Sequence, residues 1–155
     1  MKTIKLYLFG VIVWALGQGL GQSSVVTEKF LDEVEMIESS GGKFLVGDRG
    51  KSLGAFQMSR AAWKDATDFR QRQGMAIYRY EDGAMKAEIC RSYATSYLQL
   101  LEERLERLMG QEPTAKHVYA AYNWGLSNLK KVRFDLNKAP KVTRRALKRI
   151  SLKST

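Results

Sequence analysis

The sequence predicts a mainly α-helical protein: one domain with a small irregular or β-hairpin segment near residues 43–54. Apolar residues recur at three- and four-residue spacing over much of the chain, which is the pattern of a buried helix face. Capping residues and glycines mark the ends of these stretches, and strand signals are few. A chain of 155 residues, 45% of them hydrophobic, is long enough to bury one compact core.

The first 21 residues have the order of a secretory signal peptide. Lys2 and Lys5 precede an apolar run at residues 6–16, and small residues follow as far as Gly21. An uncleaved anchor is the alternative, but this run is shorter than the ~20 residues that a helix needs to cross a bilayer. We therefore expect an exported protein, periplasmic or secreted, with no stable membrane anchor and a mature domain at residues 22–155.

The first helix is expected at residues 27–39. Thr27 suits the N-cap position, and apolar residues follow at helical spacing. The glycine pair at 41–42 should end this helix. Residues 43–53 contain glycines at 47 and 50 after a short apolar segment, so they predict an irregular loop or a small hairpin.

Further helices are expected along the rest of the chain. Ser59 suits the N-cap of a short helix that extends through Ala66, and the polar stretch 70–74 is expected to be a connection. The longest helix is expected at about 82–109, where Gly110 closes it. Another is expected at 114–122, with the lone histidine, His117, exposed on it, and a last, basic helix at 142–150.

The longest expected helix has an apolar stripe on one face and a solvent-exposed face opposite. Glu103 and Arg107, four residues apart, are expected to pair on the exposed face. The stripe consists of Cys90, Tyr93, Ala94, Tyr97, Leu101, Leu105 and Leu108. Because Cys90 is the only cysteine, no intramolecular disulfide can form. We interpret Cys90 as a core residue rather than a nucleophile.

The formal charge of +10 is concentrated near the C-terminus. Residues 130–153 hold ten lysines and arginines and one acid, Asp135, a local balance of +9. Such a segment attracts polyanions, for example nucleic acid, a phospholipid surface or anionic cell-envelope polymers. The export signal argues against nucleic acid, and a solvated basic face without any partner is the alternative.

Glu38 is the residue best placed for chemistry. Leu31 and Val34 precede it by seven and four residues, so Glu38 leaves the first helix on its apolar side. A carboxyl group withdrawn from water has a raised pKa, which suits a general acid at neutral pH. Read alone, the signal is weak, because a glutamate in the last turn of a helix is far more often simply solvated.

Four short motifs support the chemical interpretation. They are ESSGG at residues 38–42, GDRG at 47–50, GAFQM at 54–58 and AYNWG at 121–125. In this order they resemble the motifs of lytic transglycosylases and goose-type lysozymes, over roughly residues 27–131. The resemblance implies a lysozyme-like fold and cleavage of peptidoglycan between N-acetylmuramic acid and N-acetylglucosamine.

The same resemblance implies roles for individual residues. Glu38 becomes the proton donor to the glycosidic oxygen, Gln57 hydrogen-bonds the substrate from the cleft wall, and Tyr122 and Asn123 orient Glu38 and the sugar N-acetyl group. The substrate-binding set is Ser39, Gln57, Met58, Tyr122, Asn123 and Trp124. Trp124 stands where the family commonly has a small residue, and either stacking on a sugar or core packing suits it.

The chain departs from the family pattern in ways that bear on the reaction. No tyrosine follows Tyr122, although these enzymes often have one in the final helix, near Ala146. Asp48 stands where goose-type lysozymes have Asp and lytic transglycosylases commonly have Ser. An inverting hydrolase needs a second carboxylate ~6.5–9.5 Å from the first, and Asp48 is the candidate. A turn-forming role is its alternative.

We therefore expect a lytic transglycosylase that forms 1,6-anhydromuramyl ends, with hydrolysis assisted by Asp48 as the second interpretation. A non-catalytic wall-binding protein and a basic nucleic-acid-binding domain are further alternatives. No cofactor is implied, and no cluster of His, Cys and acids has metal-ligand spacing. The protein is expected to act as a monomer on peptidoglycan glycan strands.

Overall fold

The computed structural model describes residues 23–151. The expected signal peptide and residues 152–155 lie outside this range. The described chain is mainly helical with one small antiparallel sheet, which confirms the predicted fold class. No helix within it is both long and apolar enough to cross a membrane.

Helix α1 (Glu28–Ser39) begins and ends close to its predicted bounds. The Thr27 hydroxyl accepts a hydrogen bond from the Phe30 amide at 3.2 Å, which satisfies one of the free N–H groups of the first turn. At the other end Ser40 takes a left-handed conformation, with φ of 56°, before the glycine pair. The reversal therefore starts one residue earlier than the glycines suggest.

The predicted hairpin is present and belongs to a three-stranded sheet. Strands β1 (Val46–Gly47), β2 (Ser52–Leu53) and β3 (Met58–Ser59) pair in the order β1-β2-β3, each antiparallel to its neighbour. Gly54 follows β2 with φ of +79°, and a Cβ there would lie 2.0 Å from the main-chain oxygen of Ala84. Only glycine fits this close approach.

Helix α2 (Arg60–Arg72) is capped by Ser59 as expected, but it is longer than predicted. The interpretation of residues 70–74 as a connection is wrong for their first part, because Arg70 belongs to the helix and is buried. Its guanidinium donates to the main-chain oxygen of Ala76 and to the Ser96 hydroxyl. These hydrogen bonds offset the desolvation cost of burying the Arg70 charge.

The longest helix, α4 (Ala87–Met109), starts later than expected because residues Tyr80–Gly83 form a separate short helix, α3. Cys90 is buried in the core, as predicted. Leu108 is not part of the buried stripe, since it is 42% exposed in the last turn of the helix. Arg107 donates to the main-chain oxygen of Glu103 rather than to its carboxylate.

The C-terminal third of the described chain contains more separate helical elements than the sequence predicts. Helix α5 (Ala115–Ala120) is followed directly by a π-helical turn, Ala121–Gly125, and by α6 (Leu126–Lys131). A 3-10 turn (Leu136–Lys138) leads to α7 (Lys141–Leu147). His117 is half-buried rather than exposed, because its ring completes a capping box with Thr114 at the start of α5.

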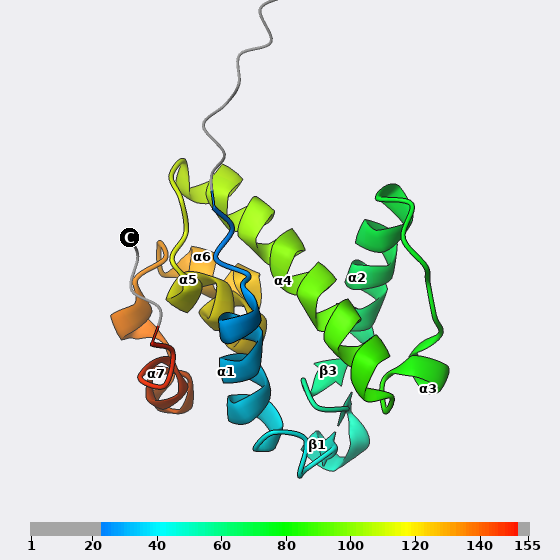
Figure 1. Cartoon of the computed structure of the whole chain (residues 1–155). Coiled ribbons are helices and arrows are strands. Elements are labelled where there is room, and N and C mark those ends of the chain that lie inside the picture. Colours follow the sequence, from blue (N-terminus) through cyan, green and yellow to red (C-terminus); the bar gives the residue numbers. More distant parts are fainter. Residues whose placement is uncertain (1–22, 152–155) are drawn as a thin grey trace, which may run out of the picture.

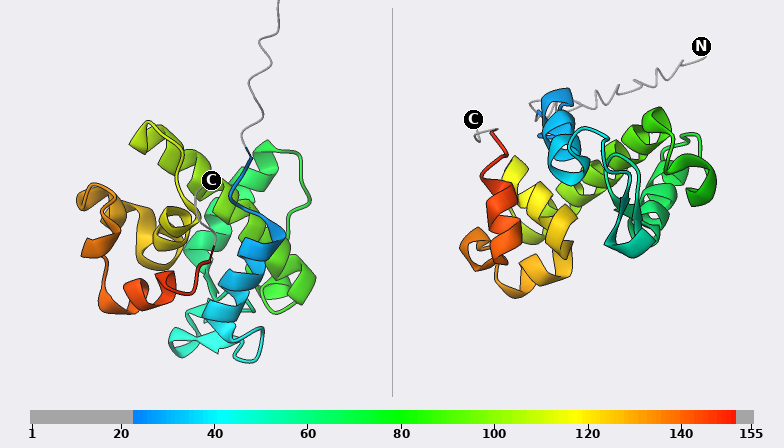
Figure 2. Two further views of the ribbon diagram at one scale, coloured as in Figure 1. Left: turned by 60° about the vertical axis from the view of Figure 1, so that its left-hand side comes forward. Right: turned by 90° about the horizontal axis from the view of Figure 1, so that it is seen from below.

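Helix α4 runs through the middle of the molecule (Figure 1). Helices α2 and α3 lie with the sheet on one side of it, while α5, α6 and α7 lie on the other (Figures 1 and 2). One cluster of buried side chains from both sides forms the core. The end of α1, the sheet and the π-helical turn therefore come close to one another across the core.

Candidate active site

A pocket of about 430 Å³ lies where the end of α1, the sheet, the start of α2, α4 and the π-helical turn meet. It brings together six of the predicted site residues, which are Glu38, Asp48, Gln57, Met58, Tyr122 and Asn123. Pockets of about 400 and 420 Å³ lie elsewhere in the described chain, but neither contains any of these residues.

Glu38 lies in the last turn of α1 with its carboxyl group half-buried in this pocket. Its Oε1 accepts hydrogen bonds from the Tyr119 hydroxyl at 2.7 Å and from Asn123 Nδ2 at 3.4 Å. Burial raises the pKa of Glu38, and the negative charge of Asp48 adds to that, while the two hydrogen bonds lower it. Burial dominates, so the pKa is raised overall, as predicted from the apolar side of the helix.

Tyr119 is the site residue that sequence reasoning missed. It is fully buried in α5, and burial together with the charge of Glu38 raises the pKa of its hydroxyl, which therefore stays protonated and donates. The available signal was its spacing: Tyr119 precedes Asn123 by four residues, so both lie on one helix face.

Tyr122 does not hold Glu38, contrary to the prediction. Its hydroxyl donates to the main-chain oxygen of Phe56 at 2.5 Å. This bond ties the π-helical turn to the loop before β3, so Tyr122 shapes the pocket wall. Burial raises the pKa of Tyr122 strongly, which keeps the donor proton in place.

Asn123 contacts Glu38 as predicted, and α7 fixes its orientation. The Asn123 Oδ1 accepts from the Thr143 hydroxyl at 2.9 Å, which leaves the amide nitrogen facing Glu38. Thr143 is buried on the inner face of α7. The final helix thus contributes to the site through Thr143, while the hydroxyl on Glu38 comes from Tyr119 in α5.

Asp48 lies in the turn between β1 and β2, at the edge of the pocket. Its φ of 46° is a turn conformation, and its Oδ2 accepts a long hydrogen bond of 3.5 Å from the Ser52 hydroxyl. Asp48 also lines the pocket, and its charge acts on Glu38. The pocket therefore contains two carboxyl groups, one half-buried and one exposed.

Gln57 lines the pocket, but its amide nitrogen is already engaged. Nε2 donates to the main-chain oxygens of Phe44 and Gly54, both at 3.0 Å. Its Oε1 occupies the space that a side chain at residue 47 would need, since a Cβ on Gly47 would lie 1.8 Å from it. Gln57 therefore holds the sheet and its loops together within the pocket wall.

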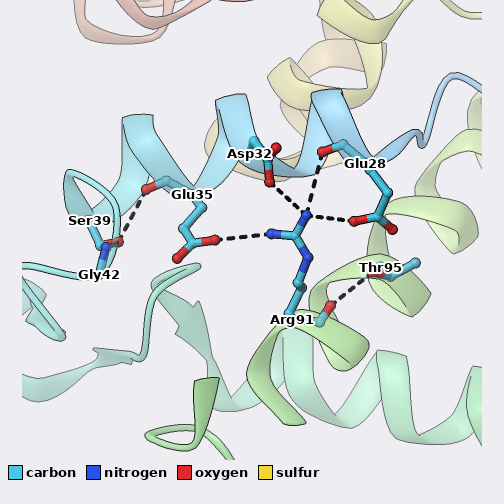
Figure 3. A network of polar contacts seen from close by, with 7 residues as sticks. All are labelled: Glu28, Asp32, Glu35, Ser39, Gly42, Arg91 and Thr95. Carbon is cyan, nitrogen blue, oxygen red and sulfur yellow. Dashed lines mark hydrogen bonds and ion pairs between the residues drawn. The ribbon is translucent and has the colours of Figure 1, made fainter. Parts of the chain in front are cut away.

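Two predicted substrate-binding residues are not placed in the pocket. Ser39 is buried, and its hydroxyl donates to the Glu35 oxygen and accepts from the Gly42 amide, so it closes the end of α1 (Figure 3). Trp124 is half-buried against the core and does not line the pocket, which favours core packing over sugar stacking.

A salt-bridge network holds α1 on α4 (Figure 3). Arg91 of α4 reaches Glu28 and Asp32 at 2.7 Å each and Glu35 at 3.1 Å. The three acids stand four and three residues apart, so they share one face of α1. Arg91 thereby helps to set the position of the helix that carries Glu38.

Among residues 23–151, no group of three or more His, Cys, Asp or Glu side chains is placed to hold a metal ion. No protein-family model, curated protein or solved structure matches this chain.

Proposed function

We propose that this protein cleaves the glycan strands of peptidoglycan between N-acetylmuramic acid and N-acetylglucosamine, with Glu38 as the general acid. The observation that carries the proposal is the environment of Glu38. Its carboxyl group has a pKa raised by burial, faces a polar pocket and is oriented by Tyr119 and Asn123. A carboxylic acid in such a setting keeps its proton to a higher pH and can donate it to a leaving group.

The favoured reaction is transglycosylation. Glu38 gives its proton to the glycosidic oxygen as the bond from that oxygen to the anomeric carbon breaks. The resulting carboxylate is stabilised by the hydrogen bonds from Tyr119 and Asn123. It then takes the proton of the muramic C6 hydroxyl, whose oxygen bonds to the anomeric carbon and closes a 1,6-anhydro ring.

Hydrolysis is the second candidate, because Asp48 lies in the same pocket as Glu38. Here the Asp48 carboxylate accepts a proton from a water molecule, whose oxygen adds to the anomeric carbon. In transglycosylation the same carboxylate has a smaller role, which is to stabilise positive charge on the sugar ring. The two reactions thus differ in how much they depend on Asp48.

The expected export and the basic C-terminal segment are consistent with a substrate in the cell wall, but neither identifies it. A wall-binding protein without activity is the competing proposal. A half-buried acid with two aimed hydrogen-bond donors favours an enzyme, because binding a neutral sugar does not require an acid of raised pKa.

Digestion of purified peptidoglycan, followed by mass analysis of the fragments, tests the proposal. Glu38→Gln should abolish release while its circular dichroism spectrum stays that of the wild type. The matched control is Glu88→Gln, an exposed residue of α4 that should leave the rate unchanged. Failure of the wild type to release fragments at every pH tested would overturn the enzymatic proposal.

The product ends decide between the two reactions. Anhydromuramyl ends that persist in Asp48→Asn would establish transglycosylation. Reducing ends whose release drops by at least about a hundredfold in Asp48→Asn would establish hydrolysis, since removal of a general base costs about that much.

A further inference from the structure

Charge is strongly segregated in the described chain. Residues 130–151 hold nine lysines and arginines and a single acid, Asp135, so this segment has a net charge of +8. Residues 23–129 hold 14 lysines and arginines and 15 acids, a net charge of −1. The positive charge of the described chain therefore belongs to α6, α7 and the residues that connect and follow them.

We call these nine side chains the basic surface, and all nine are exposed. They are Lys130, Lys131, Arg133, Lys138, Lys141, Arg144, Arg145, Lys148 and Arg149. The ion pairs found among residues 23–151 all involve cations between Arg60 and Arg104. The one acid of the segment, Asp135, accepts from the Asn137 amide and caps a turn.

Helix α7 shows the arrangement most clearly. Lys141, Arg144, Arg145 and Lys148 follow one another at three-, one- and three-residue steps, so they lie on one face. Thr143, Leu147 and Ile150 are buried on the opposite face. Helix α7 therefore presents a basic outer face, while its inner face supports the pocket through Thr143.

This arrangement is unfavourable for the isolated protein. Like charges four residues apart on a helix destabilise it by roughly 0.2–0.5 kcal/mol per pair. A cation in the first turn, such as Lys141, also opposes the helix dipole. Since none of the ion pairs found among residues 23–151 involves these nine cations, an external polyanion is the compensating partner that the charge distribution indicates.

We infer that the basic surface binds a linear phosphodiester polymer of the cell envelope, at a place separate from the pocket. This goes beyond the proposed glycan cleavage and does not depend on it. Arginine guanidiniums and lysine ammoniums both bind phosphate oxygens well, and a convex helix face suits a flexible chain that lies along it.

The scarcity of exposed apolar side chains on the basic surface favours a polymer over a bilayer with inserted side chains or a single-stranded nucleic acid. Peripheral membrane helices insert apolar side chains beside their cations, and single-stranded nucleic acids stack on aromatic rings. Of the large apolar side chains exposed in the described chain, Val142 alone belongs to the basic segment. The surface therefore offers charge without the apolar or aromatic contacts that the other two partners use.

Binding of soluble poly(glycerol phosphate) to the full chain, measured by titration calorimetry at several salt concentrations, tests the inference. The variant K141Q/R144Q/R145Q/K148Q should bind at least about tenfold more weakly, with a shallower dependence of affinity on salt. The control variant K43Q/R72Q/K86Q/R107Q removes four exposed cations elsewhere. Because its net charge is the same, it should bind within about twofold of the wild type.

Equal loss of binding in the two variants would overturn the inference, because net charge rather than the basic surface would then control binding. Tighter binding to anionic phospholipid vesicles or to DNA, at equal phosphate concentration, would overturn the choice of partner. Thermal unfolding confirms that each variant folds, and R144Q/R145Q replaces the fourfold variant if that one does not. Release of fragments from peptidoglycan should be unchanged in K141Q/R144Q/R145Q/K148Q, which separates this surface from the pocket.

Discussion

Replacement of Tyr119 by Phe should lower the free energy of unfolding most at the pH values where Glu38 is ionised. The Tyr119 hydroxyl makes the shorter of the two hydrogen bonds to Glu38 Oε1, 2.7 Å against 3.4 Å for Asn123. A donor stabilises a carboxylate more than a carboxylic acid, so its loss raises the pKa of Glu38 further. Tyr119→Phe removes this donor and little else, since the ring is fully buried in both forms.

The size of this destabilisation depends on whether the acceptor, the Glu38 carboxyl group, is charged. A hydrogen bond to a charged group contributes about 1.5–3 kcal/mol, and one between neutral groups about 0.5–1.5 kcal/mol. The cost of Tyr119→Phe in the free energy of unfolding should therefore rise by roughly 1–1.5 kcal/mol from acid to neutral or basic pH. The sign of the pH dependence follows from linkage. Because the pKa of Glu38 is raised in the folded state, its carboxyl group contributes stability at low pH, and this contribution is lost as the pH rises through the folded-state pKa.

Urea denaturation between pH 4 and 9 measures the effect in the wild type, Tyr119→Phe, Glu38→Gln and the double variant. In the Glu38→Gln background the cost of Tyr119→Phe should not depend on pH, because residue 38 no longer titrates. The difference between the two backgrounds isolates the coupling of Tyr119 to the ionised carboxylate. A cost that is constant with pH in the Glu38 background would refute the assigned hydrogen bond.

Three further substitutions test other parts of the structure, each by urea denaturation. Gly54→Ala should lower the free energy of unfolding by about 2 kcal/mol or more, because the new Cβ would lie 2.0 Å from a main-chain oxygen. Gly74 is the control: it also has a positive φ, but a Cβ there would meet no atom within 4 Å, so Gly74→Ala should cost less. Arg91→Met should cost about 1 kcal/mol at low salt and less at 1 M salt, since its ion pairs are partly exposed; a cost unaffected by salt would contradict this. Thr143→Val keeps the shape of the buried side chain and should cost about 1 kcal/mol by removing the donor to Asn123; a cost near zero would contradict the assigned bond.

The starts of α1, α2 and α5 were predictable because they depend on local chemistry. Thr27, Ser59 and Thr114 each precede a helical stretch in the sequence, and each hydroxyl accepts a hydrogen bond from the first turn of its helix. Interruptions within helices were harder to predict. The separation of α3 (Tyr80–Gly83) from α4 depends on the fit of the chain against α2 and the loop at Gly54, which no local pattern records.

Buried polar residues were predicted poorly for a related reason. Arg70 belongs to a polar stretch, so the sequence indicated an exposed connection, yet distant oxygens of Ala76 and Ser96 satisfy its guanidinium. Thr143 lies in a basic helix with no local signal of burial, yet it is buried against Asn123. Pairing partners that are remote in the chain decide whether such a residue is buried, and a single sequence does not show them.

The candidate site was predicted at the level of its motifs but not of its hydrogen bonds. Glu38, Asp48 and Asn123 share a pocket as expected, while the hydroxyl assigned to Tyr122 comes from Tyr119. The four-residue step from Tyr119 to Asn123 places both side chains on one helix face, so this pairing was available from spacing. The spacing does not show the π-helical turn at Ala121–Gly125, in which the Tyr122 hydroxyl donates to Phe56 instead of Glu38.

The π-helical turn also explains how Glu38 can be buried and still function as a titrating group. Burial alone raises its pKa, and a carboxyl group with no donors would pay a large penalty to ionise. The turn and α5 aim Tyr119 and Asn123 at the same oxygen, Oε1, so the carboxylate formed after proton donation is stabilised there. The other oxygen, Oε2, has no hydrogen bond from the described residues. Since a proton on Oε1 would conflict with the two donors, Oε2 is the atom from which Glu38 should deliver its proton.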